Sequence, residues 1–106
     1  METWVSAIIR GAQPGKTICI RHDMDALPIQ EQTGLDFSSE KEGVSHSCGH
    51  DIHTVIALYC TKLLQERRME PKGNVRVVFQ PAEENAQGAK AMVKSGIMQQ
   101  TPLNDY

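Results

Sequence analysis

The sequence predicts an α/β domain, in which helices cover a small, largely parallel sheet. Two short segments, 16–22 and 74–80, are rich in β-branched and apolar residues, as strands are. Between them lies segment 50–68, the longest run with apolar residues at helical spacing. A strand, a helix and a second strand in this order are typical of parallel strands joined by a right-handed crossover. The helices are then expected to pack on the faces of the sheet.

The N-terminal part is expected to hold two strands followed by a long loop. Residues 4–10 alternate weakly between apolar and polar, and residues 11–15 have the composition of a turn. Strand 16–22 is therefore expected to pair with 4–10 as a hairpin. The next segment, 23–47, contains glycine, proline and scattered polar residues, which predicts a loop. A loop of about 25 residues is unusual in a small domain, and such loops tend to be functional.

The remaining elements complete the predicted order β-β-loop-α-β-α. Helix 50–68 is expected to pack through its periodic apolar residues, which are Ile52, Val55, Ile56, Tyr59, Leu63 and Leu64. Strand 74–80 follows, and Pro81 stands where the first turn of a helix tolerates proline. A second helix is expected over 82–95, with Gly96 as its stop. Its packing stripe is expected to consist of Ala82, Ala86, Ala89, Met92 and Val93.

Composition limits the number of domains and the classes of partner. A chain of 106 residues and 11.8 kDa fits one compact domain. The net charge of −2, the pI near 6.0 and the aromatic content of 5% disfavour a nucleic-acid partner. No apolar run is long enough for a membrane span, and the N-terminus lacks the pattern of a signal peptide. The odd number of cysteines, 3, without a CxxC pair predicts a reducing, cytoplasmic setting.

Residues that can carry chemistry gather at three points, each next to the end of a predicted strand or the start of the long helix. The three pairs are Asp23 with Asp25, Cys48 with His50, and Glu83 with Glu84. In open α/β sheets, ligands bind outside the carboxyl ends of the strands. The predicted topology therefore brings the three pairs to one edge of the sheet.

Each pair also has a simpler interpretation. Asp23 and Asp25 fit a solvated turn, although alternate residues of an extended segment point the same way. Cys48 and His50, separated by one glycine, suit a metal that accepts thiolate and imidazole ligands. A nucleophilic Cys48 with His50 as its base, or a buried cysteine beside a helix cap, are the alternatives. His53 shares a helix face with His50, or it forms a hydrogen bond within the core.

The pair of Glu83 and Glu84 stands at the start of the second predicted helix, where the helix dipole favours carboxylates. On a helix their side chains diverge by about 100°. One carboxylate is then free to bind a metal while the other faces a substrate and acts as a base.

Three motifs occur in the order and with the spacing of a known family. They are Arg-His-Asp-Met-Asp-Ala-Leu-Pro-Ile-Gln-Glu at 21–31, Ser-Cys-Gly-His-Asp-Ile-His at 47–53 and Phe-Gln-Pro-Ala-Glu-Glu at 79–84, followed by Gly88, Ala89 and Met92. From about Val5 to Gly96 the chain resembles the M20 metallopeptidase family. It is most similar to the amidohydrolase branch, which includes hippurate, N-acyl-amino-acid and auxin-conjugate hydrolases.

The resemblance implies a three-layer zinc-peptidase sheet with helices, and a two-metal site for zinc or manganese. It implies that Cys48, His50 and Glu84 are metal ligands and that Glu83 is the catalytic base. Asp25 then falls on a carboxylate that supports the catalytic site. In other branches Asp25 is the second residue of an HxD pair, and here Asp23 takes the place of the histidine. The implied reaction is attack of a metal-activated water on the amide of an N-acyl amino acid or small peptide.

The chain also departs from the family. Family members are several times longer and contain two further histidine ligands downstream, whereas this sequence has 4 histidines, the last of them His53. Residues 1–98 are therefore interpreted as a partial, truncated catalytic domain and residues 99–106 as an atypical tail. Such a fragment is expected to be inactive alone and to form homo-oligomers through uncovered strand edges. The alternative is a catalytically dead module for self-association or interaction.

Overall fold

The structure is a computed structural model, and it describes residues 3–99. The elements follow the predicted order: β1 (Val5–Arg10), β2 (Gln13–Asp23), α1 (His50–Glu66), β3 (Lys72–Gln80) and α2 (Gln87–Lys94). The connection between β2 and α1 contains an isolated bridge between Leu27 and Ser45 but no helix or named strand. The long loop predicted from glycine, proline and polar residues is thus confirmed.

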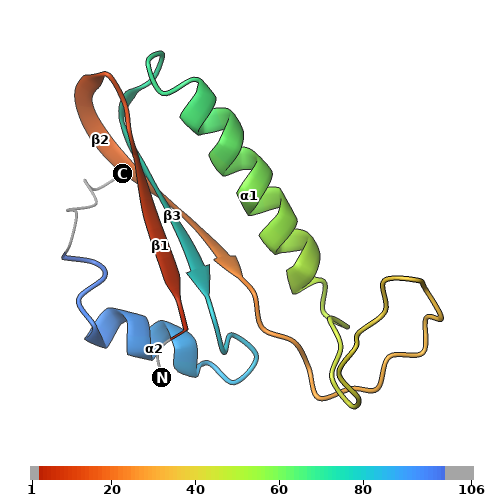
Figure 1. The fold of residues 1–106 in the computed structure, drawn as a ribbon. Coiled ribbons are helices and arrows are strands. Elements are labelled where there is room, and N and C mark those ends of the chain that lie inside the picture. The colour runs from red at the N-terminus through yellow and green to blue at the C-terminus, as the bar shows by residue number, and fades with distance from the viewer. Residues whose placement is uncertain (1–2, 100–106) are drawn as a thin grey trace.

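The sheet has the strand order β1-β3-β2 (Figure 1). β3 runs parallel to β2 and antiparallel to β1, so the predicted parallel pair is confirmed. The predicted hairpin between the first two strands is wrong, because β3 lies between them. β3 has a continuous run of buried residues, 76–80, whereas only Ile9 of β1 and Thr17 and Asp23 of β2 are buried. The centre of a sheet buries both faces of a strand, which accounts for the unbroken buried run of β3.

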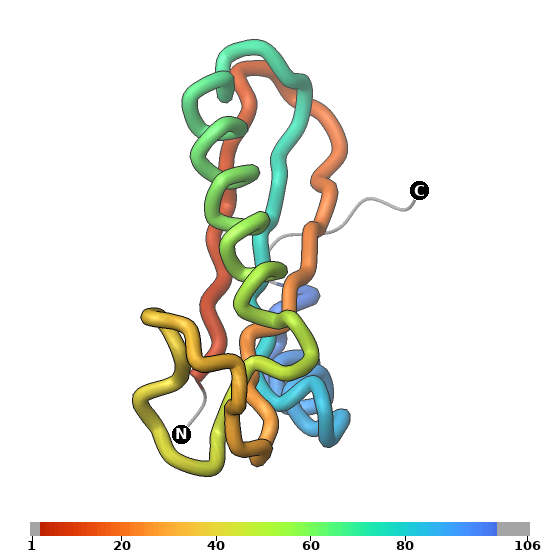
Figure 2. Tube along the Cα trace, turned by 90° about the vertical axis from the view of Figure 1, so that its right-hand side faces the viewer, coloured from red at the N-terminus to blue at the C-terminus, as the bar shows by residue number. Residues whose placement is uncertain are grey.

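The two helices lie on opposite faces of this sheet (Figure 1, Figure 2). Ala57 of α1 packs with Ile9, Val77 and Phe79, while Met92 of α2 packs with Val78 and Ile97. Neighbouring residues of β3 contribute to different clusters because successive side chains of a strand point to opposite faces. The molecule is therefore a three-layer α/β/α structure, as predicted.

The face of α1 that packs on the sheet differs from the prediction. It consists of residues spaced at i, i+4, i+7, i+11 and i+14, of which all but the last are small or polar: His50, Thr54, Ala57, Thr61 and Leu64. Five of the six residues of the predicted packing stripe are exposed: Ile52, Val55, Ile56, Tyr59 and Leu63. The spacing predicted the helix correctly, but its apolar stripe faces away from the sheet. Small side chains such as Ala57, with an exposed fraction of 0%, let the helix lie close to the strands.

The second helix begins at Gln87, later than the predicted Ala82. Ala82 and Ala86 have φ values of 51° and 57°, in the left-handed region that a helix cannot include. Glu83 and Glu84 therefore lie in a turn before α2, not in its first helical turn. Of the predicted packing stripe, Met92 is buried, whereas Ala86, Ala89 and Val93 are exposed.

The predicted tail, 99–106, lies outside the described residues except for Gln99. Within residues 3–99, no helix combines the length and the apolar character that crossing a membrane requires.

Candidate metal centre

Three chain segments meet at one edge of the sheet, where β2 and β3 end and α1 begins (Figure 1). β2 and β3 are parallel and end in register, with Asp23 opposite Gln80. Asp25 follows β2 and lies against His50, the first residue of α1. Glu83 and Glu84 follow β3 and lie close to the same imidazole. The predicted convergence of the three pairs is confirmed.

His50 is fixed by Asp25. Its Nδ1 atom lies 3.0 Å from the backbone oxygen of Asp25 and 3.2 Å from Oδ1 of the same residue. A carbonyl oxygen only accepts hydrogen bonds, so Nδ1 of His50 is the donor and carries the proton. The neutral ring then presents the lone pair of Nε2, the form in which histidine binds metals.

Acidic oxygens surround this Nε2 atom. Oδ1 of Asp23 lies at 3.7 Å, Oε1 of Glu84 at 3.8 Å and Oε2 of Glu83 at 4.0 Å. The ligand atoms of Cys48, His50 and Glu84 all lie within 4.8 Å of one another. A thiolate, an imidazole and a carboxylate at this separation fit a divalent cation such as zinc.

The glycine between Cys48 and His50 allows both to reach the same point. Gly49 has a φ of 86°, a left-handed conformation that turns the chain sharply before α1. Residues two apart on a helix face different directions, but this turn directs both side chains to the centre.

Asp25 also holds the turn that carries the two glutamates. The backbone N–H of Glu84 donates to Oδ2 of Asp25 at 3.2 Å. Burial alone raises the pKa of Asp25, but hydrogen bonds from the backbone N–H groups of Glu84 and Glu83 lower it below its usual value. One carboxylate thus joins the start of α1 to the turn after β3.

The charges at the centre favour protonated Cys48 in the absence of a cation. The carboxylate of Glu84 accepts a hydrogen bond from the thiol and raises the pKa of Cys48. A raised thiol pKa disfavours a cysteine nucleophile. Burial lowers the pKa of His50, but the carboxylates of Asp23 and Asp25 outweigh it, so the pKa is raised.

Of the two glutamates near His50, Glu83 has the more exposed side chain. Its side chain keeps 38% of its surface exposed, and its Oε1 atom lies 3.9 Å from Nη2 of Arg21. The carboxylate is therefore in reach of water, of Nε2 of His50 and of a cation at once.

The structure adds residues to which the sequence assigned no role at the site. Nδ1 of His53 donates to Oδ1 of Asp23 at 2.5 Å, and Nη1 of Arg21 donates to Oδ2 at 3.3 Å. His53 does not lie in the core, since 52% of its side chain is exposed. A second group of three metal-ligating residues results, Asp23 with His50 and His53. The contact between Arg21 and Asp23 could have been predicted from the sequence, because residues two apart on one strand share a face.

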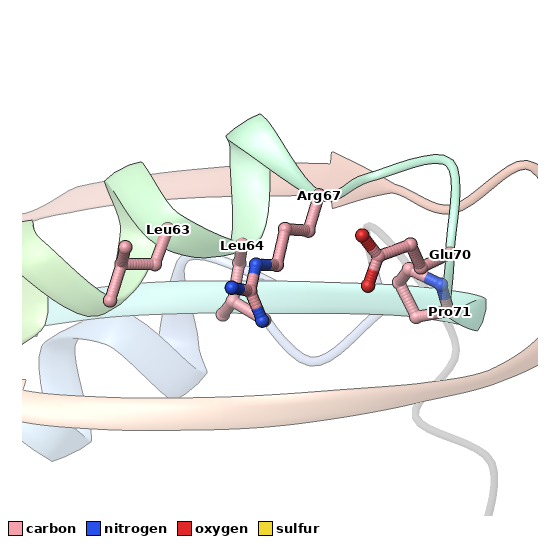
Figure 3. A pocket seen from close by; sticks show the side chains of 5 residues that line it. All are labelled: Leu63, Leu64, Arg67, Glu70 and Pro71. Carbon is pink, nitrogen blue, oxygen red and sulfur yellow. The ribbon is translucent and has the colours of Figure 1, made fainter.

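A cavity of about 510 Å³ lies elsewhere, at the C-terminal end of α1 (Figure 3). Leu63, Leu64, Arg67, Glu70 and Pro71 line it. Both metal-ligating groups found within residues 3–99 lie at the opposite end of the helix. The candidate metal centre and this cavity are therefore separate sites.

Comparison with known proteins identifies the family. Residues 19–106 match peptidase family M20/M25/M40. The chain belongs to this family. Among curated relatives, N-acetylcysteine deacetylase of Bacillus subtilis is 50% identical over 98 residues, which cover 92% of this chain and 26% of the relative. Thermostable carboxypeptidase 1 of Saccharolobus solfataricus is 46% identical, with coverage of 92% of this chain and 25% of the relative.

A solved structure confirms the fold. The dinuclear metal-binding M20 peptidase of Bacillus subtilis superimposes with a TM-score of 0.89 at 50% identity, over 92% of this chain and 27% of that protein. The chain spans about a quarter of the length of the M20 relatives that it matches.

Proposed function

We propose that this chain supplies part of the catalytic centre of a metal-dependent hydrolase that cleaves the amide bond of N-acyl amino acids or small peptides. The observation that carries the proposal is the grouping of Cys48, His50 and Glu84 within 4.8 Å, with Glu83 beside them. The similarity to deacetylases and a carboxypeptidase supports the choice of bond.

The three ligands differ in chemical type, and their assigned roles follow from this. Cys48 and Glu84 bring negative charge, and His50 offers a neutral nitrogen whose orientation Asp25 fixes. Zinc or manganese held here would supply Lewis acidity, which polarises the scissile carbonyl and makes the attacking water more acidic. The complete family site holds two ions, and three ligands on this chain suffice for one ion with open positions.

Glu83 is assigned as the base. Its carboxylate lies 4.0 Å from Nε2 of His50 and does not need to be a ligand, because Glu84 occupies that role. It takes the proton from the attacking water, holds it on a carboxylate oxygen and passes it to the nitrogen of the leaving amine. Asp25 acts through His50 and the turn at Glu84, as a positioning residue.

The chain alone is expected not to turn over substrate at the rate of an enzyme. The family resemblance implies two further histidine ligands downstream, whereas all 4 histidines of this sequence lie at or before His53. We also assign it to the cytoplasm, because its cysteines, at 19, 48 and 60, are all free thiols, which are typical of reducing compartments.

Self-association is the second proposal, and one observation favours it. The outer face of α1, defined by Ile52, Val55, Ile56, Tyr59 and Leu63, is apolar and exposed. A contiguous apolar face of this kind marks an interaction site. A second copy of the chain is the proposed occupant. The uncovered edges of β1 and β2 offer additional pairing.

A chimera tests the proposed hydrolase function. Residues 3–99 would replace the matching segment of the Bacillus subtilis N-acetylcysteine deacetylase, with which the chain is 50% identical. We expect metal-dependent hydrolysis of N-acetyl amino acids, and we expect Glu83→Gln to lower kcat by about 10²–10⁴-fold. Exposed Glu42→Gln is the matched control. A folded chimera with no activity, or one that Glu83→Gln leaves unchanged, would contradict the assignment.

A further inference from the structure

Two groups of potential ligands compete for one nitrogen atom. One group consists of His50 with Cys48 and Glu84, and the other consists of His50 with Asp23 and His53. Nδ1 of His50 is engaged by Asp25, so only Nε2 remains for a cation. A single nitrogen lone pair binds one ion, and the two groups cannot both use it.

The hydrogen bonds of Asp23 show which group is free to bind. Oδ1 accepts from Nδ1 of His53 at 2.5 Å, and Oδ2 accepts from Nη1 of Arg21 at 3.3 Å. Both oxygens of Asp23 are therefore used by donors of the protein. A carboxylate accepts but does not donate, so Nδ1 of His53 carries a proton and is not available as a ligand atom.

The same contacts hold the negative charge of Asp23 beside the centre. Its two oxygens accept from the His53 ring and from the Arg21 guanidinium, which fixes the carboxylate in place. Its Oδ1 atom lies 3.7 Å from Nε2 of His50. The ring of His53 also stacks on that of His50, with centroids 5.7 Å apart and an angle of 25°.

We propose that His53 is a positioning residue of the metal centre: by donating to Asp23 it fixes that carboxylate beside Nε2 of His50, and neither residue is itself a ligand. This inference rests on the proposed function, because it takes Cys48, His50 and Glu84 as the ligand set. It assigns His53 and Asp23 to the environment of His50. Such partners of a metal-binding histidine orient the ring and strengthen the site.

Cobalt(II) titration of the full chain tests the inference. Cobalt bound to a thiolate absorbs in the near ultraviolet, and its visible bands report the ligand set. His53→Ala removes the donor, whereas His53→Asn keeps an N–H close to the position of Nδ1. Because 52% of the His53 side chain is exposed, neither substitution disturbs the core, which circular dichroism would verify.

We expect His53→Ala to weaken cobalt binding by about 10–100-fold, with the thiolate absorption retained at saturation. We expect His53→Asn to restore most of the affinity with an unchanged spectrum. His46→Asn, a change at an exposed histidine of the long loop, is the matched control and should have no effect.

The possible failures are distinguishable. If His53→Ala binds cobalt as tightly as the wild type, the positioning role is wrong while the ligand set stands. If His53→Asn is as weak as His53→Ala and its visible bands differ from those of the wild type, His53 is a ligand and the inference is overturned. If the wild type shows no thiolate absorption with cobalt, the ligand set of the proposed function is wrong, and the inference fails with it.

Discussion

At the scale of single residues, Glu31 organises the first half of the long loop. Its carboxylate accepts hydrogen bonds from the hydroxyl of Thr33 and from the backbone N–H of Ser39. These bonds lower the pKa of Glu31. A lowered folded-state pKa means that the bonds contribute fully above the usual carboxyl pKa and are lost as the pH falls through the lowered value.

We therefore expect Glu31→Gln to make the amide hydrogen of Ser39 exchange faster at neutral pH. In the wild type, acidification through the lowered pKa of Glu31 should shift the resonances of this loop toward those of the variant. Hydrogen exchange and NMR titration measure the two effects, and Glu42→Gln in the same loop is the control. Equal exchange in the wild type and in Glu31→Gln would show that the carboxylate does not hold the loop.

The sequence predicted the residues of the centre but not all of their partners. The family resemblance singled out Cys48, His50 and Glu84 as expected ligands, and the structure places their ligand atoms within 4.8 Å of one another. The pair of Asp23 and His53 was not predicted, because its members are separated by a long loop whose path the sequence does not specify. Their hydrogen bond depends on how α1 is rotated about its axis.

At the scale of elements, the pairing of β2 with β3 depends on one glycine. Gly73 has a φ of 84°, and a Cβ atom at this position would lie 2.0 Å from the backbone oxygen of Lys16. The register of the two strands shifts between Gln13 and Thr17, next to this contact. The close approach is therefore part of how the strands enter the sheet.

Gly73→Ala should lower the free energy of unfolding by about 3 kcal/mol or more, since it combines backbone strain with a clash against backbone atoms. Gly34→Ala is the matched control: its φ is 67°, but no atom lies within 4 Å of the added Cβ. It should cost only about 1–2 kcal/mol. Urea unfolding of the two variants measures the difference, and equal losses would mean that the clash at Gly73 is relieved without cost.

The orientation of α1 could not be predicted from the spacing of its apolar residues. The apolar stripe of Ile52, Val55, Ile56, Tyr59 and Leu63 predicted a helix correctly, but it could not predict which side meets the sheet. The contact of His50 with Asp25 at the start of α1, and the small Ala57 in the middle, place the opposite face inward. The strand order was predicted wrongly because neighbours in the chain were assumed to pair. In the structure β3 lies between β1 and β2, and its residues 76–80 are buried.

At the scale of the whole molecule, exposed apolar surface is concentrated on α1. β3 is paired on both sides, and its Val77, Val78 and Phe79 are buried. Ile18 of β2 is 52% exposed, and the larger apolar area lies on the outer face of α1. The proposed self-association would therefore bury a helix face more than strand edges.

We expect light scattering at micromolar concentration to show a dimer or larger oligomer. Tyr59→Glu, which places a charge within the outer face of α1, should shift the chain toward monomers. Gln65→Glu, which adds the same single negative charge at another exposed position of α1, is the control for net charge. A stable, well-folded wild-type monomer would show that the outer face needs no partner.

The central claim is that Cys48, His50 and Glu84, from two segments distant in sequence, form one cation site. Zinc titration by calorimetry tests this claim most directly, with Cys60→Ser as the control for loss of an exposed thiol. We predict that the wild type and Cys60→Ser bind fewer than two zinc ions per chain and that Cys48→Ser loses most of this binding. Two tightly bound ions in a monomer, or undiminished binding by Cys48→Ser, would contradict the account.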